Sequence, residues 1–208
     1  MKILIGDDHS VVRKGLIQIL KEAYPFSEIT EATNGPELFK LALKNDYEII
    51  ISDITMPGRS GIDFIKEIKD IQPKTPILIL SIHPAELYAL RTIKAGASGY
   101  INKESAPEEL IIAVKQLING KKYITNDVAE ILFESKKNTG NLALHDSLSN
   151  REFEVFKLIA SGKTSSQIAK ELSLSSNTVS TYKTRLLEKM KLKNIADITR
   201  YAIENKLF

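Results

Sequence analysis

The sequence has 208 residues, a formal net charge of +3 and no cysteine. Its length allows two modest domains, and its 43% hydrophobic and 26% charged residues are typical of soluble globular proteins. The lack of cysteine excludes disulfides, zinc–thiolate sites and cysteine nucleophiles. Because no run approaches about 18 apolar residues and no signal-peptide pattern opens the chain, we expect no membrane span and a cytoplasmic location.

Charge is distributed unevenly along the chain. Residues 1–143 hold 18 Lys or Arg and 19 Asp or Glu, whereas residues 144–208 hold 11 and 7. The basic C-terminal part could meet nucleic acid, but this excess alone is weak evidence for it.

The first 120 residues alternate short apolar runs with amphipathic stretches. The apolar runs are rich in Ile and Leu and too short for helices, which is typical of strands buried on both faces. These runs are 2–6, 28–30, 48–52, 76–81 and 98–102. Apolar residues recur at helical spacing between them. Five successive βα units predict an α/β fold with a doubly wound, five-stranded parallel sheet.

Acidic and polar residues stand at the ends of these predicted strands. Asp7 and Asp8 follow the first strand and Asp53 follows the third, while Ser81 ends the fourth and Lys103 follows the fifth. Ligands of such sheets bind at the carboxyl ends of the strands, so we expect these side chains to gather there. Three carboxylates, a hydroxyl and a lysine suit a hard divalent cation such as Mg²⁺ and a phosphoryl group, which an aspartate can accept.

Each of these residues also has a simpler interpretation when taken alone. An aspartate after a strand is usually a turn residue or a helix cap, and Asp8 could cap a helix that begins near Ser10. Lys103 could be a solvated surface lysine, and His9 a residue at a helix start. Five such residues at the ends of four strands argue against coincidence.

Residues 1 to about 120 resemble the receiver domain of two-component response regulators. The resemblance is carried by the pair Asp7-Asp8, by Asp53 with "MPG" at 56–58 and Gly61 behind it, by Ser81, by "GASGY" at 96–100 and by Lys103. One departure is Glu104, where many receivers have proline.

The resemblance implies a phosphoryl-acceptor site that contains a metal. Asp53 would accept a phosphoryl group from the phosphohistidine of a sensor histidine kinase. Asp8, Asp53 and the backbone carbonyl of Thr55 would ligate Mg²⁺, and Asp7 would hold the metal through water.

The resemblance also implies three residues that respond to the phosphoryl group. Ser81 would donate a hydrogen bond to its oxygens, and Lys103 would pair with them. Ser81 and Tyr100 match the hydroxyl and aromatic switch pair of the family, so Tyr100 would move inward behind Ser81 on phosphorylation.

The middle of the chain predicts a connection between two domains. Residues 127–135 predict one short helix, and the polar stretch 136–141 predicts a flexible linker. We therefore expect a receiver domain at 1–122, a linker with a short helix at 123–146 and a helical domain at 147–208.

The last 62 residues predict an all-α domain of four helices. Ser149 and Glu152 have the spacing of a capping box. Val179, Tyr182, Leu186 and Met190 form an apolar stripe on the third helix, opposite small polar and basic residues. A short helix, a turn and a longer helix with such an exposed face are typical of a helix-turn-helix that enters the DNA major groove. A dimerisation bundle with solvated charge would give the same pattern.

The segment from Leu148 to Phe208 resembles the helix-turn-helix of the LuxR family. The matching motifs are "LSNRE", "GKTSSQIAKEL" and "SSNTVSTYKTRLLEKM". Joined to a receiver, this segment resembles the NarL/FixJ class of response regulators, which implies double-stranded DNA as a partner. By position, base edges would be faced by Ser180, Thr181 and Thr184, and phosphates would be held by Thr178, Lys183 and Arg185, with Tyr182 beneath the helix and within reach of a phosphate.

The two resemblances together predict a transcription regulator rather than an enzyme, and a homodimer when it is phosphorylated. Ile198, Tyr201 and Ala202 of the last helix would either contact a second copy or pack under the recognition helix. A receiver that acts only through protein partners is an alternative. An aspartyl-nucleophile phosphatase or hydrolase is another, although "GDDHS" lacks two aspartates two positions apart and 120 residues leave no room for a substrate cap.

Overall fold

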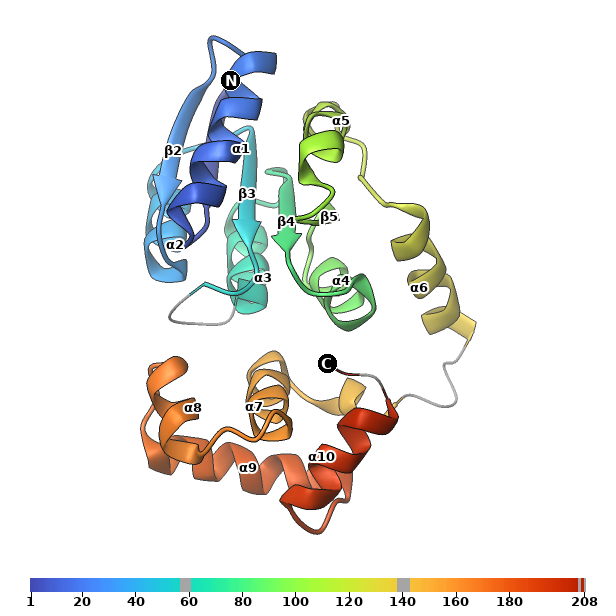
Figure 1. The fold of residues 1–208 in the computed structure, drawn as a ribbon. Coiled ribbons are helices and arrows are strands. Elements are labelled where there is room, and N and C mark those ends of the chain that lie inside the picture. The colour runs from blue at the N-terminus through green and yellow to red at the C-terminus, as the bar shows by residue number, and fades with distance from the viewer. Residues whose placement is uncertain (57–60, 138–142, 206, 208) are drawn as a thin grey trace. The chain divides into compact units, whose positions relative to one another are not determined.

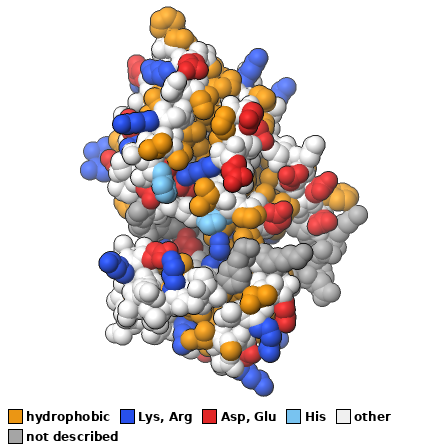
Figure 2. Space-filling model, in the orientation of Figure 1, with side chains coloured by type: hydrophobic (Ala, Val, Ile, Leu, Met, Phe, Trp, Pro, Cys, Tyr) orange, Lys and Arg blue, Asp and Glu red, His pale blue; other side chains and the backbone are white. Residues whose placement is uncertain are grey.

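The computed structural model describes residues 1–56, 61–137, 143–205 and 207, and the chain divides into two compact units, Met1–Ser135 and Lys136–Phe208 (Figure 1). Most of the predicted flexible linker lies outside the described residues. On the face drawn in Figure 2, acidic and basic side chains are interspersed over the first unit. Among the helices within the described ranges, none is both long and apolar enough to cross a bilayer.

The first unit is built on a five-stranded parallel sheet with the order β2-β1-β3-β4-β5. The strands are β1 (Lys2–Gly6), β2 (Glu28–Ala32), β3 (Ile49–Asp53), β4 (Ile77–Ser81) and β5 (Gly99–Asn102). Strands β1, β3 and β4 are almost wholly buried, which explains why they read as continuous aliphatic runs. The predicted doubly wound sheet is confirmed.

Five helices cover both faces of this sheet. They are α1 (Ser10–Ala23), α2 (Gly35–Lys44), α3 (Gly61–Ile71), α4 (Ala85–Lys94) and α5 (Ala106–Ile118), and α6 (Asn126–Lys137) follows them in the chain. Alternate strand residues such as Ile5 and Ile51 pack with Leu20 of α1 and Val114 of α5 in one core cluster. Helices α2, α3 and α4 pack in sequence against one another away from that cluster (Figure 1).

Strand order places the predicted site residues side by side. The chain leaves β1 toward β2 on one side and returns to β3 on the other, so a crevice opens at the carboxyl ends of β1 and β3. Gly6 is aligned with Ser52, so Asp7 and Asp53 follow at the same level, and Ser81 is aligned with Asn102, just before Lys103.

Residues beyond the predicted receiver limit pack onto the first unit. Tyr123 bridges to Gly99 at the edge of β5, and its hydroxyl donates a hydrogen bond to Glu109 at 2.9 Å. Val128 of α6 is buried. The first unit therefore continues to Ser135, while the functional domain limits stay a prediction.

Over residues 143–205, the second unit contains a short 3₁₀ helix and four α-helices, as predicted for an all-α domain. These are η1 (Leu144–Ser147), α7 (Asn150–Ala160), α8 (Ser165–Glu171), α9 (Ser176–Met190) and α10 (Ile195–Glu204). Ser149 with Glu152, and Thr164 with Gln167, form complete capping boxes. Ser175 accepts the N–H of Thr178 and is the N-cap of α9.

The last helix carries the residues for which the sequence left two alternatives open, a contact with a second copy or packing within the domain. Ile198 and Ala202 are fully buried, and the Tyr201 hydroxyl lies 3.0 Å from Nδ1 of His145. These side chains therefore pack within their own unit, beside α7 rather than under the recognition helix, and a contact of α10 with a second copy stays a prediction. Ile203 lies on the exposed face of α10.

Gly61 is required after β3 because a Cβ there would lie 2.6 Å from the carbonyl oxygen of Ile54. We expect Gly61→Ala to lower the free energy of unfolding by about 1–3 kcal/mol, as overpacking does. Gly15→Ala is the matched control, because a Cβ meets nothing within 4 Å on this exposed turn of α1. It should raise stability by about 0.5–1 kcal/mol. Hydrogen exchange of the strand amides measures both effects in the first unit, and equal effects would contradict the steric explanation.

Candidate functional sites at the sheet edge and on helix α9

Four of the predicted residues meet at the carboxyl edge of the sheet. Asp7, Asp53 and Ser81 are almost completely buried, and the side chain of Lys103 is 9% exposed. The prediction that strand ends bring these side chains together agrees with their positions, whereas the role of each remains a prediction.

The ammonium group of Lys103 bridges two carboxylates. Its Nζ lies 2.7 Å from Oδ2 of Asp7 and 2.7 Å from Oδ2 of Asp53. Its backbone N–H donates to the carbonyl oxygen of Ser81 at 2.8 Å, which fixes the start of this loop against β4. Burial opposes the charge of Lys103, but the hydrogen bonds that its ammonium donates to Asp53 and Asp7, and the negative charges of these residues, raise its pKa above the ordinary value for lysine.

Asp7 is fully buried and held from several directions. Its Oδ1 accepts the backbone N–H of His9 at 2.8 Å, and its carbonyl oxygen accepts a hydrogen bond from Arg13 at 2.7 Å. Its Oδ2 faces the Lys103 ammonium but accepts no hydrogen bond of good geometry. A buried carboxylate oxygen with this spare capacity fits a position next to a cation or to its bound water.

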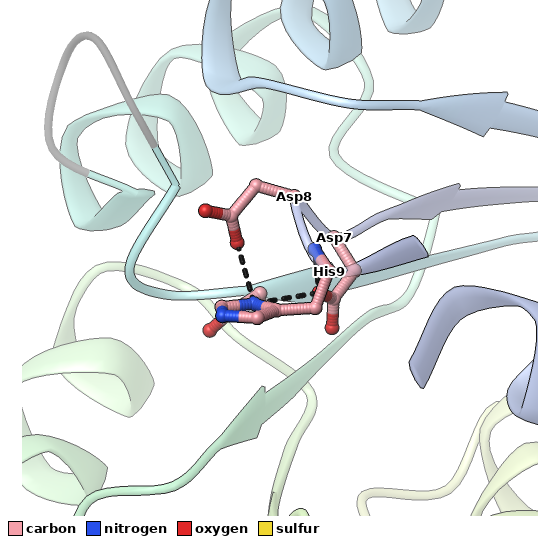
Figure 3. Close-up of side chains that lie close together, drawn as sticks. Asp7, Asp8 and His9 are labelled. Atoms are coloured by element: carbon pink, nitrogen blue, oxygen red, sulfur yellow. Dashed lines mark hydrogen bonds and ion pairs between the residues drawn. The ribbon is translucent and has the colours of Figure 1, made fainter. Parts of the chain in front are cut away.

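Asp8 pairs with the residue that follows it, His9. The N-cap position of α1 is His9, without a side-chain capping bond, so Asp8 is not the cap of this helix. Its carboxylate is 27% exposed, and its Oδ1 lies 2.9 Å from Nδ1 of His9 (Figure 3). The Asp8 carboxylate therefore contacts the His9 ring instead of capping α1, and its role as a metal ligand stays a prediction.

His9 joins the acidic residues, which the sequence interpretation did not predict. Ligand atoms of Asp7, Asp8, His9 and Asp53 all lie within 4.8 Å of one another. The only sequence signal for His9 was its position directly after the acidic pair. The carboxylate oxygens of this group suit Mg²⁺, which binds through one or two carboxylates and keeps several waters.

Thr55 contacts Asp53 through groups other than the predicted carbonyl. Its backbone N–H and its hydroxyl donate to Oδ1 of Asp53 at 3.1 and 3.2 Å. Thr55 thus holds Oδ1 of Asp53, and the Lys103 ammonium holds Oδ2. The carbonyl of Thr55 stays a predicted ligand, and residues 57 and 58 of the "MPG" motif lie outside the described residues.

Ser81 and Tyr100 are connected through the loop at His83. The hydroxyl oxygen of Ser81 accepts the backbone N–H of His83 at 3.0 Å, and the Tyr100 hydroxyl donates to the His83 carbonyl at 2.9 Å. Burial raises the pKa of Tyr100 to about 12, with the Ser81 hydroxyl opposing and the nearby Asp53 charge adding to it. Tyr100 is 1% exposed and thus already occupies the inward position that the sequence predicts for the phosphorylated form.

Hydrogen bonds to Asn102 shape the turn after β5, where Glu104 replaces the proline of many receivers. Asn102 Oδ1 accepts the backbone N–H of Glu104 at 3.0 Å, and the Asn102 carbonyl accepts from Ser105. A proline at 104 could not donate the first bond. The Asn102 side chain therefore shapes the turn that presents Lys103.

The predicted recognition helix α9 presents its polar face to solvent. Ser180, Thr181, Thr184 and Arg185 are exposed, while Val179, Leu186 and Met190 are buried beneath. The remaining predicted contacts, Thr178, Tyr182 and Lys183, are half-buried. All seven lie on α9, with α8 and a short turn before it, as in a helix-turn-helix.

The hydroxyls on this face already use their protons within the helix. Ser180, Thr181 and Thr184 donate to the carbonyl oxygens of the residues four positions earlier, at 3.0, 3.0 and 3.2 Å. Their lone pairs and the threonine methyl groups face outward. Such a face can accept hydrogen bonds and make apolar contacts.

Glu152 anchors the far end of α9. It is buried, completes the α7 capping box and lies 2.7 Å from Nζ of Lys189. Burial opposes its charge, but hydrogen bonds from Lys189 and Ser149 lower the pKa of Glu152 below its ordinary value. Because the folded pKa is lowered, this contribution to stability is present at neutral pH and is lost as the pH falls through that pKa.

Two family models match the chain. One, for the response regulator receiver domain, matches residues 3–115, and the other, for bacterial regulatory proteins of the luxR family, matches residues 146–202. The chain belongs to the NarL/FixJ class of two-component response regulators, which join these two domains.

Similar proteins span the whole chain. Oxygen regulatory protein NreC of Staphylococcus haemolyticus is 34% identical over 214 residues, and NreC of Staphylococcus epidermidis is 35% identical over 215; each alignment covers 100% of this chain and 99% of the relative. Among solved structures, RcsB from Salmonella enterica serovar Typhimurium bound to promoter rprA with phosphomimetic BeF₃⁻ has a TM-score of 0.64 at 27% identity, covering 97% of this chain and 98% of that one. A structure of two RcsB dimers bound to two parallel DNAs has a TM-score of 0.60 at 29% identity, with 97% of both chains covered.

The Lys103 bridge predicts a large loss of stability when its cation is removed. Lys103→Met leaves two buried carboxylates uncompensated, so we expect the first unit to lose about 3–5 kcal/mol in the absence of divalent cations. Added Mg²⁺ should restore part of this loss, since it binds the folded site. Hydrogen exchange of the β1 and β3 amides gives the measurement.

The control is Lys163→Met, which removes a surface pair with Glu171 in the second unit and should cost less than about 1 kcal/mol. A Lys103→Met loss as small as that of the control would contradict the bridge.

Proposed function

We propose that this response regulator takes a phosphoryl group from a sensor histidine kinase onto Asp53 and then binds double-stranded DNA as a homodimer to control transcription in the cytoplasm. The observation that carries the proposal is the buried Lys103 ammonium between Asp53 and Asp7, with the Ser81 hydroxyl on the same rim. The relatives support the DNA-binding part, because the RcsB structures contain promoter DNA and, in one case, dimers.

Phosphoryl transfer to Asp53 follows from the orientation of its oxygens. One carboxylate oxygen forms a bond to phosphorus while the phosphorus–nitrogen bond to the kinase imidazole breaks, and the imidazole nitrogen keeps the electron pair and takes up a proton. Mg²⁺ held by Asp8 and Asp53, with Asp7 behind it, would neutralise charge on the transferred group. Thr55 and Lys103 keep the acceptor carboxylate in place.

The new phosphate would rearrange the groups that hold Asp53 now. It adds close to two negative charges at pH 7, which attract the Lys103 ammonium. Ser81 accepts a hydrogen bond from the His83 N–H and lies beside the Tyr100 hydroxyl, so its own hydroxyl would have to turn toward Asp53 to donate to a phosphoryl oxygen. A shift of Ser81 would move the His83 loop and with it the partner of Tyr100.

This loop is the element through which the proposed switch would act. Tyr100 is seated inward and bound to the His83 carbonyl, so signalling needs a movement of the loop rather than a swing of the ring. The repacked surface at α4 and β5 would then favour a dimer or free the DNA-binding unit.

The central test is phosphorylation of Asp53 with an acyl-phosphate donor and Mg²⁺. We expect the wild-type protein and Asp70→Asn, which alters an exposed aspartate of α3, to gain one phosphoryl group by intact mass, and Asp53→Asn to gain none. Affinity for DNA selected from a random pool should rise by roughly 5- to 150-fold on phosphorylation, the usual range of coupling between two sites. Unchanged DNA affinity, or phosphorylation of Asp53→Asn, would refute the proposal.

A second test concerns the DNA face of α9. Lys183→Ala should weaken binding about equally on all sequences and reduce the slope of log affinity against log salt by about one, because a phosphate contact releases a counterion. Lys40→Ala removes the same charge from an exposed position on α2 and serves as the control. If both variants keep the wild-type slope, Lys183 does not contact phosphate.

A further inference from the structure

The imidazole of His9 points into the acidic site instead of capping its helix. Its Nδ1 lies 2.9 Å from Oδ1 of Asp8 and 3.4 Å from Oδ1 of Asp7 (Figure 3). The His9 side chain makes no capping bond to α1, although it occupies the N-cap position. The ring is therefore directed toward the two carboxylates by their contacts and not by the needs of the helix.

These distances fit one cation shared by the same atoms. Nitrogen and oxygen ligands about 2.1 Å from a metal lie ~3.0 Å apart on an octahedral edge and ~4.2 Å apart across it. The two contacts of His9 Nδ1 are close to an edge, and all four ligand atoms, including that of Asp53, lie within 4.8 Å. Only a small contraction separates the present arrangement from coordination.

Two further observations favour a metal over a simple ion pair. The buried Oδ2 of Asp7 lies 2.7 Å from the Lys103 ammonium in poor hydrogen-bond geometry, so this carboxylate already lies beside a positive charge that a metal ion could replace. The His9 backbone N–H donates to the other Asp7 oxygen, which ties the imidazole to the carboxylate it would share a metal with. The His9 side chain is 64% exposed, which leaves a path for an ion and lets the ring proton reside on Nε2 while Nδ1 binds.

We propose that His9 is a nitrogen ligand that makes this site bind Zn²⁺ and similar divalent transition ions, in competition with the Mg²⁺ of the proposed function on which this inference rests. Imidazole suits zinc, nickel and copper, whereas Mg²⁺ prefers oxygen ligands and retains its water. Three carboxylates alone would favour the hard ion, and one imidazole shifts the preference. A bound transition ion would occupy the carboxylates that phosphoryl transfer needs.

The test is calorimetric titration of the full-length protein with ZnCl₂ and, separately, with MgCl₂. His9→Asn should weaken Zn²⁺ binding by about 10- to 100-fold or more, since loss of a group that merely orients a ligand already costs that much. Its Mg²⁺ affinity should change far less. His145→Gln, in the other unit, is the matched control and should bind Zn²⁺ as the wild type does. In ¹⁵N spectra of the histidine rings, Zn²⁺ should shift the His9 Nδ1 signal.

The outcomes separate this inference from the proposed function. If wild type and His9→Asn bind Zn²⁺ equally, or if the His9 ring signal does not move, His9 is no ligand, while Mg²⁺ binding and Asp53 phosphorylation still stand. If the wild-type protein binds neither ion, both proposals fail.

Discussion

A single ammonium group, that of Lys103, lies between the carboxylates of Asp7 and Asp53 and balances two charges that would otherwise be buried together. Two such carboxylates without a cation would be costly in the interior of a protein. Parallel strands make the arrangement possible, because β1, β3 and β5 deliver all three residues to one edge of the sheet. A phosphate on Asp53 would compete with the carboxylates for the Lys103 ammonium. A bound metal would compete with that ammonium for the carboxylate oxygens.

The loop after β4 connects the cluster of Asp7, Lys103 and Asp53 to the rest of the receiver unit. Ser81 and Tyr100 bind the backbone of the same residue, His83, through its N–H and its carbonyl. Any group that draws the Ser81 hydroxyl toward Asp53 therefore acts on the partner of Tyr100 as well. A pocket of about 310 Å³ is lined by Tyr100 and also by Thr125 and Val128. A movement of Tyr100 would therefore alter a pocket that the start of α6 also lines.

The sequence predicted the residues whose positions follow from strand ends, and it was weaker wherever tertiary packing decides. Asp53 and Lys103 could be placed together because a parallel sheet leaves few alternatives. Helix α9 could be found from its apolar stripe and caps. The orientation of the His9 ring, by contrast, depends on contacts with Asp8 that no periodicity encodes. The burial of Ile198 against the unit's own core, rather than against a second copy, was likewise open in the sequence, since both environments require an apolar side chain.

The pKa of the Lys103 ammonium tests the bridge most directly, and ¹⁵N-detected NMR of the lysine side chains measures it in the intact protein. The account predicts a pKa above the ordinary value of about 10.4 in the wild type, and a lower pKa in both Asp7→Asn and Asp53→Asn, because each variant removes one of the two charges that hold the proton. A wild-type pKa at or below that of the exposed lysines, unchanged in the two variants, would contradict it.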